Sequence, residues 1–152
     1  MAEEQTAPQI RINAQYIKDL SFENPNSPAV LAEPPKDTGL NINVNVEAAQ
    51  LEGATFEVVI KFDIQASSVE TTIFIIDLTY AGVFTLVGIP QEQIEIACLV
   101  ECPRLIFPFA RRVIGDLTRD GGFMPLLLDP IDFMRLYQQN RQQQAEAPQT
   151  TQ

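Results

Sequence analysis

The chain has 152 residues, a hydrophobic fraction of 45% and a formal net charge of -10 at pH 7. A chain of this length builds one domain with a sizeable core, and its negative charge disfavours nucleic acid and anionic membranes as partners. It contains no histidine, so the commonest general base and transition-metal ligand is missing.

The charge is distributed unevenly along the chain. Residues 1–102 hold 15 acidic and 4 basic side chains, whereas residues 103–152 hold 5 acidic and 6 basic ones. An acidic region of this kind can attract a basic partner, or can serve only as a solvated surface.

Both ends of the chain are polar. The first nine residues, MAEEQTAPQ, lack the apolar core of a signal peptide, and no apolar run approaches the roughly 20 residues of a membrane span. We therefore expect a cytoplasmic protein that does not insert into membranes. Residues 1–9 are predicted to be disordered and residues 10–137 to form a single domain. The Gln-rich residues 138–152 are predicted to form a frayed helix end and a disordered tail.

Four segments alternate apolar and polar residues with the period of a β-strand, at residues 10–22, 40–46, 56–64 and 74–80. In the first segment the alternation predicts that the even-numbered apolar residues from Ile10 to Phe22 share one buried face. Short turns join the last three segments, which predicts an antiparallel meander. In the fourth segment Ile73 and Ile75 lie on the opposite face, which indicates that another layer or subunit covers part of it.

A long connection separates the first two predicted strands, at residues 23–39, and contains four prolines. Connections of this length are usually functional or disordered. Val30 and Leu31 give this one apolar side chains with which to pack.

Helices are predicted after the strands. Pro90 suits the first turn of a helix over residues 91–101, which Pro103 is expected to interrupt. From residue 105 to 119 apolar residues recur at spacings of three and four, which is typical of an amphipathic helix.

Residues 120–122, Asp-Gly-Gly, are a strong stop signal. The last helix is predicted to begin with Asp129 as its N-cap and Pro130 in its first turn. The pattern thus predicts an α+β fold, a four-stranded antiparallel sheet followed by two helices. Four strands and one long helix can bury one face of the sheet. The chain carries more apolar side chains than this packing requires, which favours an oligomer.

The sequence carries no nucleotide-binding, zinc-protease or nucleophile-elbow motif. Acidic residues on predicted solvent faces or loops include Asp19, Glu23, Glu57, Asp63 and Asp77, and no spacing forces a catalytic pair among them. A hydrolase based on paired carboxylates therefore stays a remote alternative.

Cys98 and Cys102 are separated by three residues and would share a face of a helix. The favoured interpretation is two small buried apolar side chains, and the alternative is a zinc site shared between subunits. We predict no metal and no cofactor in this chain.

The interhelix segment, residues 123–128, is unusually apolar for a loop broken by glycine and proline. Large apolar side chains on a connection either cap the core or bind an apolar partner. Together with Phe133 and Tyr137, this segment favours binding of varied apolar partners.

Three segments resemble SecB, the bacterial protein-export chaperone. They are YIKDLSFENPNSP (residues 16–28), AGVFTLVGI (residues 81–89) and CPRLIFPFARRVIGDLTRDGGFMPLLLDPIDF (residues 102–133). The resemblance is collinear over residues 10–137. It implies an ATP-independent holdase that keeps secretory precursors unfolded and delivers them to the translocation ATPase SecA. It also implies a homotetramer, assembled as a dimer of dimers.

The resemblance also implies roles for individual residues. The SecA-binding positions are matched by Asp19, Glu23, Ile75 and Asp77, with Ile75 and Asp77 standing where the family has Leu and Glu. The client-binding grooves are implied at Phe22, Leu40, Ile42, Val44, Phe123, Leu126, Leu128, Phe133, Leu136 and Tyr137. The oligomer interface is implied at Tyr16, Ile76, Leu78, Tyr80, Ile106, Phe109 and Val113, with Phe109 in place of the family's Tyr. The alternative function is a SecB-like chaperone dedicated to a toxin–antitoxin partner.

Overall fold

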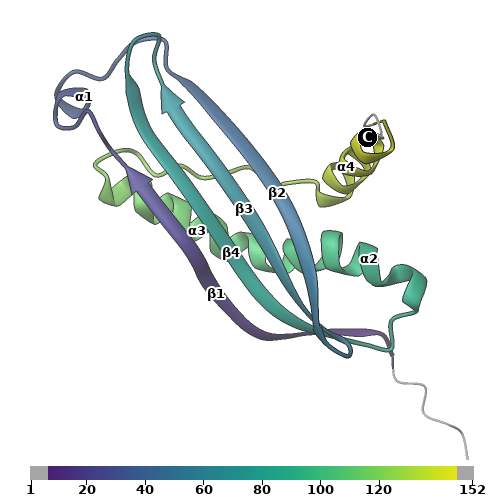
Figure 1. Ribbon diagram of the computed structural model, residues 1–152. Helices are drawn as coiled ribbons and strands as arrows, with labels where there is room; N and C mark the ends of the chain where they lie inside the picture. The colour runs from purple at the N-terminus through teal and green to yellow at the C-terminus, as the bar shows by residue number, and fades with distance from the viewer. Residues whose placement is uncertain (1–6, 147–152) are drawn as a thin grey trace, which may run out of the picture.

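A computed structural model describes residues 7–146 of the chain and contains one four-stranded antiparallel sheet (Figure 1). Its strands are β1 (Gln9–Glu23), β2 (Gly39–Glu52), β3 (Thr55–Ser67) and β4 (Thr72–Val87), in the spatial order β1-β4-β3-β2. The predicted meander of the last three strands and the α+β class are confirmed.

The long helix α3 (Cys102–Asp120) lies on one face of this sheet, and the apolar residues of β3 and β4 point toward it. Ile60, Phe62, Ile64, Ile76 and Leu78 are almost fully buried between the central strands and α3. We call this side of the sheet the core face and the opposite side the outer face. Strand alternation therefore separates an apolar side from a mainly polar one.

Strand β1 departs from the single buried face that its alternation predicted. Its register against β4 shifts between Ile12 and Ala14 and again between Ile17 and Asp19. Each shift inserts one extra residue, which exchanges the two faces of the strand. Tyr16, paired with Ala81, consequently lies on the outer face, so the predicted common face of the even-numbered residues is wrong.

The long connection between β1 and β2 is ordered and includes a short helix, α1 (Ala29–Ala32). Val30 is buried, and the Asn24 side chain donates a 2.9 Å hydrogen bond from Nδ2 to the carbonyl of Gly121 at the end of α3. The crossover is thus attached to the helical layer at that end of the sheet.

One continuous helical run follows β4. It comprises η1 (Gln91–Gln93), α2 (Ile94–Ile96), the π-helical η2 (Ala97–Glu101) and α3. The predicted interruption at Pro103 is wrong, because Pro103 lies in the first turn of α3 and the run stays helical on both sides of it. The wider turns of η2 precede it, as expected where a helix accommodates a local irregularity.

The last helix, α4 (Phe133–Glu146), begins later than predicted. Its N-cap is Asp132 rather than Asp129, since the Asp132 carboxylate accepts a 3.1 Å hydrogen bond from the Arg135 backbone N–H. The helix continues past residue 137, which had been predicted as the end of the domain. The predicted disorder at residues 1–6 and 147–152 lies outside the described residues.

In Figure 1 α3 crosses one face of the sheet, whereas α4 lies beyond the β2 edge, close to α2. No helix among residues 7–146 is long and apolar enough to cross a membrane.

Gly82 of β4 permits the close approach of α3. A Cβ at this position would lie 2.7 Å from Cε2 of Phe84 and 3.3 Å from Cγ2 of Ile106. We expect Gly82→Ala to lower the free energy of unfolding by about 1–3 kcal/mol through overpacking. Urea denaturation at fixed protein concentration measures this change.

Gly39→Ala is the control, because its Cβ would meet only the Ser67 carbonyl, at 4.0 Å. Equal losses of stability in the two variants would contradict the packing account.

Candidate functional site

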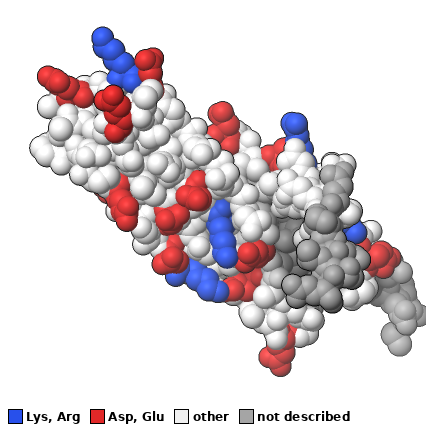
Figure 2. Space-filling model, turned by 45° about the horizontal axis from the view of Figure 1, so that its top comes forward, with Lys and Arg blue, Asp and Glu red and all other residues white. Residues whose placement is uncertain are grey.

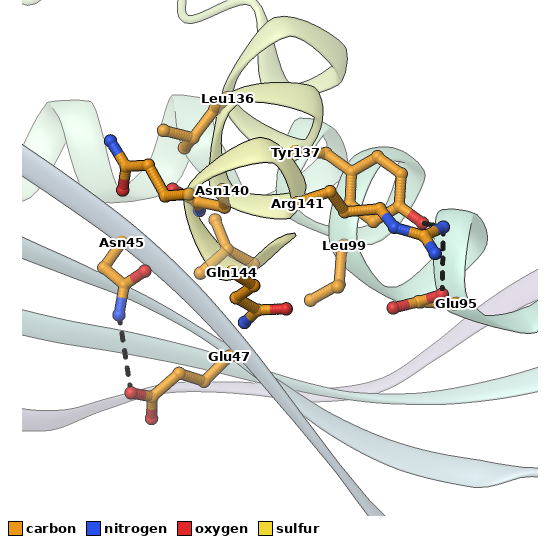
Figure 3. Close-up of a pocket in the computed structure, with 11 residues that line it drawn as sticks. Asn45, Glu47, Glu95, Leu99, Leu136, Tyr137, Asn140, Arg141 and Gln144 are labelled. Atoms are coloured by element: carbon orange, nitrogen blue, oxygen red, sulfur yellow. Dashed lines mark hydrogen bonds and ion pairs between the residues drawn. The ribbon is translucent and has the colours of Figure 1, made fainter. Parts of the chain in front are cut away.

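A groove follows the free edge of the sheet along β2. Two adjoining hollows, of about 460 and 490 Å³, share Val46, Glu47, Glu95 and Leu99 in their walls. Edge-strand β2 forms one side and the helical run forms the other. At one end α4 adds a wall that is rich in amide side chains (Figure 3). The groove therefore offers apolar contacts beside many hydrogen-bonding groups.

Helix α4 is held at this groove by a few specific contacts. Figure 3 shows the Arg141 guanidinium directed toward the Tyr137 hydroxyl, to which it donates a 3.0 Å hydrogen bond, and toward Glu95, at 3.8 Å. Beneath them Phe133 is 1% exposed and meets the Phe107 ring edge-on at 5.9 Å. Apolar packing at the start of α4 and a polar contact farther along thus fix the helix beside α2 and η2.

The ten residues expected to bind clients fall into three groups. Leu40 and Ile42 on β2 are exposed by 46% and 38%. Half-buried positions are Phe22, Val44, Phe123, Leu126 and Leu136. Leu128, Phe133 and Tyr137 are buried in the protomer's own core, where Phe133 and Tyr137 form the apolar stripe of α4. These three support the groove from beneath and leave little surface for a ligand.

Sequence reasoning missed the apolar continuation of the groove past α4. Val46, Phe56, Ile94 and Leu99 line it. Val46 continues the alternation of β2, which is a signal in the sequence. The other three could not be assigned to the same groove, because only the fold brings the helical run beside β2.

The two apolar connections meet at the far end of α3. The Phe74 ring lies between those of Phe22 and Phe123, with centroid distances of 6.2 and 5.3 Å. Beyond this aromatic cluster Met124 and Leu127 are exposed by 89% and 70%. A second apolar surface therefore extends from the crossover onto the interhelix segment.

The outer face carries a separate acidic cluster, formed by Asp19, Glu23, Asp63 and Asp77. Asp63 and Asp77 are directly paired across β3 and β4, and Ile75 lies half-buried beside Glu23. Burial, followed by repulsion from Asp63, Glu23 and Asp19, raises the pKa of Asp77 above its ordinary value. The structure thus brings all four expected SecA-binding positions to one face.

Asp63 belongs to this cluster but was not among the expected positions. Its role depends on the register between β3 and β4, which the sequence pattern does not specify. Figure 2 shows acidic side chains spread along the visible face of the molecule, with lysines and arginines beside some of them.

Tyr16 lies farther along the outer face. Its hydroxyl donates a hydrogen bond to the Glu57 carboxylate, which also pairs with Lys18 at 2.7 Å. The bond to Glu57, with some burial, raises the pKa of Tyr16 to about 12. The Lys18 and Tyr16 hydrogen bonds lower the pKa of Glu57. This network keeps the aromatic side chain fixed on the sheet.

The residues expected at the oligomer interface do not form one surface. Ile76, Leu78, Tyr80 and Ile106 are buried in the protomer's core, because β4 is central and α3 covers it. They have no free surface to offer to a second subunit. Tyr16 and Val113 are half-buried, and Phe109 is 43% exposed.

A different set of apolar side chains remains uncovered on this side of α3. Leu105 and Phe109 form an exposed stripe on the helix, and Ile12, Ile17 and Leu20 are exposed on the core face of β1. The irregular register of β1 concealed Ile17, which breaks the parity of its neighbours, whereas Ile12 and Leu20 were expected to be buried.

The sequence matches one family of known proteins over nearly its whole length. The family model "Preprotein translocase subunit SecB" matches residues 3–144. The chain is 50% identical to a protein-export protein SecB of Rhodopseudomonas palustris over 140 residues, which cover 92% of this chain and 89% of the relative. It is 46% identical to that of Parvibaculum lavamentivorans, over 93% of this chain and 84% of the relative. The chain therefore belongs to the SecB family of protein-export chaperones.

A solved structure shares the fold at low sequence identity. It is the Mycobacterium tuberculosis SecB-like chaperone in complex with a ChAD peptide from the HigA1 antitoxin. Its TM-score is 0.66 and its identity 15%, over 80% of this chain and 90% of that one. This likeness supports the fold described above.

The raised pKa of Asp77 predicts a dependence of stability on pH. The folded state holds the proton of Asp77 more tightly than the unfolded chain does, so ionising this group costs stability as the pH rises through its pKa. Asp77→Asn should raise the melting temperature at pH 7, by roughly 1–2 °C for an exposed group. The gain should vanish below about pH 3.9, the ordinary pKa of an aspartate, and shrink in high salt.

Differential scanning calorimetry at several pH values measures this gain. Glu52→Gln, at the exposed β2–β3 turn, removes the same charge away from the cluster. A lower melting temperature for Asp77→Asn than for the unsubstituted protein at pH 7 would contradict the repulsion.

Proposed function

We propose that this protein is an ATP-independent holdase of the cytoplasm. It binds unfolded secretory precursors on the apolar surfaces beside β2 and at the interhelix segment, and it delivers them to SecA through the acidic cluster on the outer face. The names of its relatives, protein-export proteins, support the export role. The observation that carries the proposal is that the apolar groove and the acidic cluster lie on opposite faces of the same sheet.

Holding a client needs no nucleotide. Exposed apolar side chains bind an unfolded chain but find few partners on a folded one, so binding withdraws the unfolded form by mass action. The contacts are spread over Leu40, Ile42, Met124 and Leu127, among others, and no single one should dominate. Asparagine and glutamine side chains at the α4 end of the groove can satisfy the backbone of an extended client.

Delivery requires a contact that does not compete with the client. The acidic cluster is separated from the groove by the thickness of the sheet, so a basic partner can approach it while a client is bound. The half-buried Ile75 adds an apolar group at its margin. Like charges held together at Asp77 cost stability, and a basic partner would relieve that cost.

The central test separates these two activities. Asp19→Lys combined with Glu23→Lys should weaken SecA binding by at least about tenfold, because the two lysines neutralise the net charge of the cluster. The same variant should still arrest the refolding of an unfolded precursor, as followed by light scattering and intrinsic fluorescence. Glu52→Lys with Glu92→Lys makes the same change of net charge away from the cluster.

Loss of both activities together in the first variant would contradict the separation of the two surfaces. If the unsubstituted protein left precursor refolding unchanged, the holdase function itself would be refuted. In that case a dedicated client becomes the better account. The solved SecB-like chaperone bound to an antitoxin peptide provides the precedent for that alternative.

Self-association is part of the proposal. The exposed stripe of α3 and the uncovered core face of β1 adjoin the same side of the protomer, and covering them would remove several apolar side chains from water. We propose that they form the contacts of a homotetramer, a dimer of dimers. Phe109 was expected there from the resemblance. Ile12, Ile17, Leu20 and Leu105 take the place of the expected residues that are buried.

Phe109→Asp should break the tetramer into smaller species, because it places a charge in an apolar interface. The protomer should stay folded, since this side chain is exposed there. Light scattering measures the mass, and circular dichroism checks the fold. Leu51→Asp, at another exposed apolar side chain, should leave the mass unchanged. An unchanged mass for Phe109→Asp would refute the interface.

A further inference from the structure

Thr118 is the one polar side chain in the fully buried core of residues 7–146, where it is 0% exposed. Its hydroxyl lies 3.0 Å from the carbonyl oxygens of Ile114 and Gly115, one turn back along α3, and donates to them. A buried hydroxyl in a helix usually needs no more than such a bond. Here the same oxygen also accepts a 2.8 Å hydrogen bond from the Leu126 backbone N–H.

The interhelix segment is attached to α3 through this residue. The Thr118 carbonyl accepts a second hydrogen bond, of 3.0 Å, from the Phe123 N–H. The segment also lies close to the helix at Gly115, where a Cβ would be in van der Waals contact with the Leu127 side chain, at 3.4 Å, and with the Leu126 carbonyl oxygen, at 3.6 Å. The segment has no regular secondary structure of its own, so these contacts hold its backbone in place.

This attachment determines which side chains of the segment face solvent. Phe123 and Leu126 turn inward and are half-buried, and Leu128 is buried. Met124 and Leu127 are strongly exposed, although one end of the Leu127 side chain lies against α3 at Gly115. A free loop with these residues would collapse onto itself or onto the groove, because apolar side chains avoid water. The fixed backbone keeps the two exposed side chains available.

We infer that Thr118 is a positioning residue for polypeptide binding: its hydroxyl fixes the interhelix segment so that Met124 and Leu127 are presented to an unfolded chain. This inference rests on the proposed holdase function. A prearranged loop binds more tightly than a mobile one, because less conformational entropy is lost on binding. Thr118 itself touches no client, since it lies beneath the segment.

Thr118→Val tests this role, since it keeps the shape of the side chain and removes the hydroxyl. The probe is reduced, carboxymethylated lactalbumin, which cannot refold. We expect its dissociation constant to rise about fivefold, which corresponds to the loss of one buried hydrogen bond. Hydrogen exchange at the Leu126 amide should accelerate, while exchange in β3 and β4 stays slow. Thr118→Ser retains the hydroxyl and should restore both properties to within about twofold.

Ile114→Val is the control for general destabilisation, because it removes one buried methylene one turn away on the same helix. It should lower the melting temperature but leave the affinity for the unfolded probe unchanged. Equal losses of affinity in Thr118→Val and Ile114→Val would overturn the inference, and so would an unchanged affinity in Thr118→Val. If the unsubstituted protein bound no probe, both the inference and the proposed holdase function would be refuted. Accelerated Leu126 exchange in Thr118→Val would then show that the hydroxyl only holds the segment.

Discussion

The helical layer is narrower than the sheet that it covers, and the binding properties of the molecule follow from this mismatch. Four strands are roughly 19 Å wide, whereas one helix with its side chains is about 10–12 Å across. Helix α3 therefore buries the centre of the core face, on β3 and β4, and leaves both edge strands partly uncovered. On one flank Val46 lines the groove and Leu40 and Ile42 are exposed farther along β2. On the other flank apolar residues of β1 are exposed beside α3, which contacts this strand. We propose that one flank binds clients and the other a second copy of the chain.

The alternation of β-strands keeps these surfaces apart from the acidic cluster. Successive side chains point to opposite faces, so Asp63 and Asp77 reach the outer face from the same strands whose apolar residues form the core. A sheet that is apolar on both faces would bury the cluster or bind clients on the wrong side. The raised pKa of Asp77 indicates that the protein tolerates some repulsion at this surface. A repulsive acidic surface of this kind agrees with the proposal that it binds a basic partner.

Much of this arrangement could be predicted from the sequence, and what could not depended on contacts between distant residues. The alternation of β2, β3 and β4 predicted their faces correctly, and the stop signal at residues 120–122 predicted the end of α3. The bulges of β1 were missed, because the second inserted residue restores the parity that the first one shifts, so Ile12 and Leu20 still fit one alternating pattern. Asp132 was missed as the cap of α4, because Asp129 followed by Pro130 is an equally good local signal. Ile76 and Ile106 were expected at an interface, yet only the strand order shows that they belong to the centre of the protomer.

Site-specific photocrosslinking of a bound client tests the two-surface account most directly. A photoreactive phenylalanine derivative at Ile42 or Met124 should crosslink to reduced, carboxymethylated lactalbumin. The same group at Asp63, on the outer face, should not, and none of the three positions should crosslink to the folded, disulfide-intact protein. Crosslinking to the unfolded chain at Asp63, with none at Ile42 or Met124, would contradict the assignment of the apolar surfaces beside β2 and at the interhelix segment to clients and of the outer face to a basic partner.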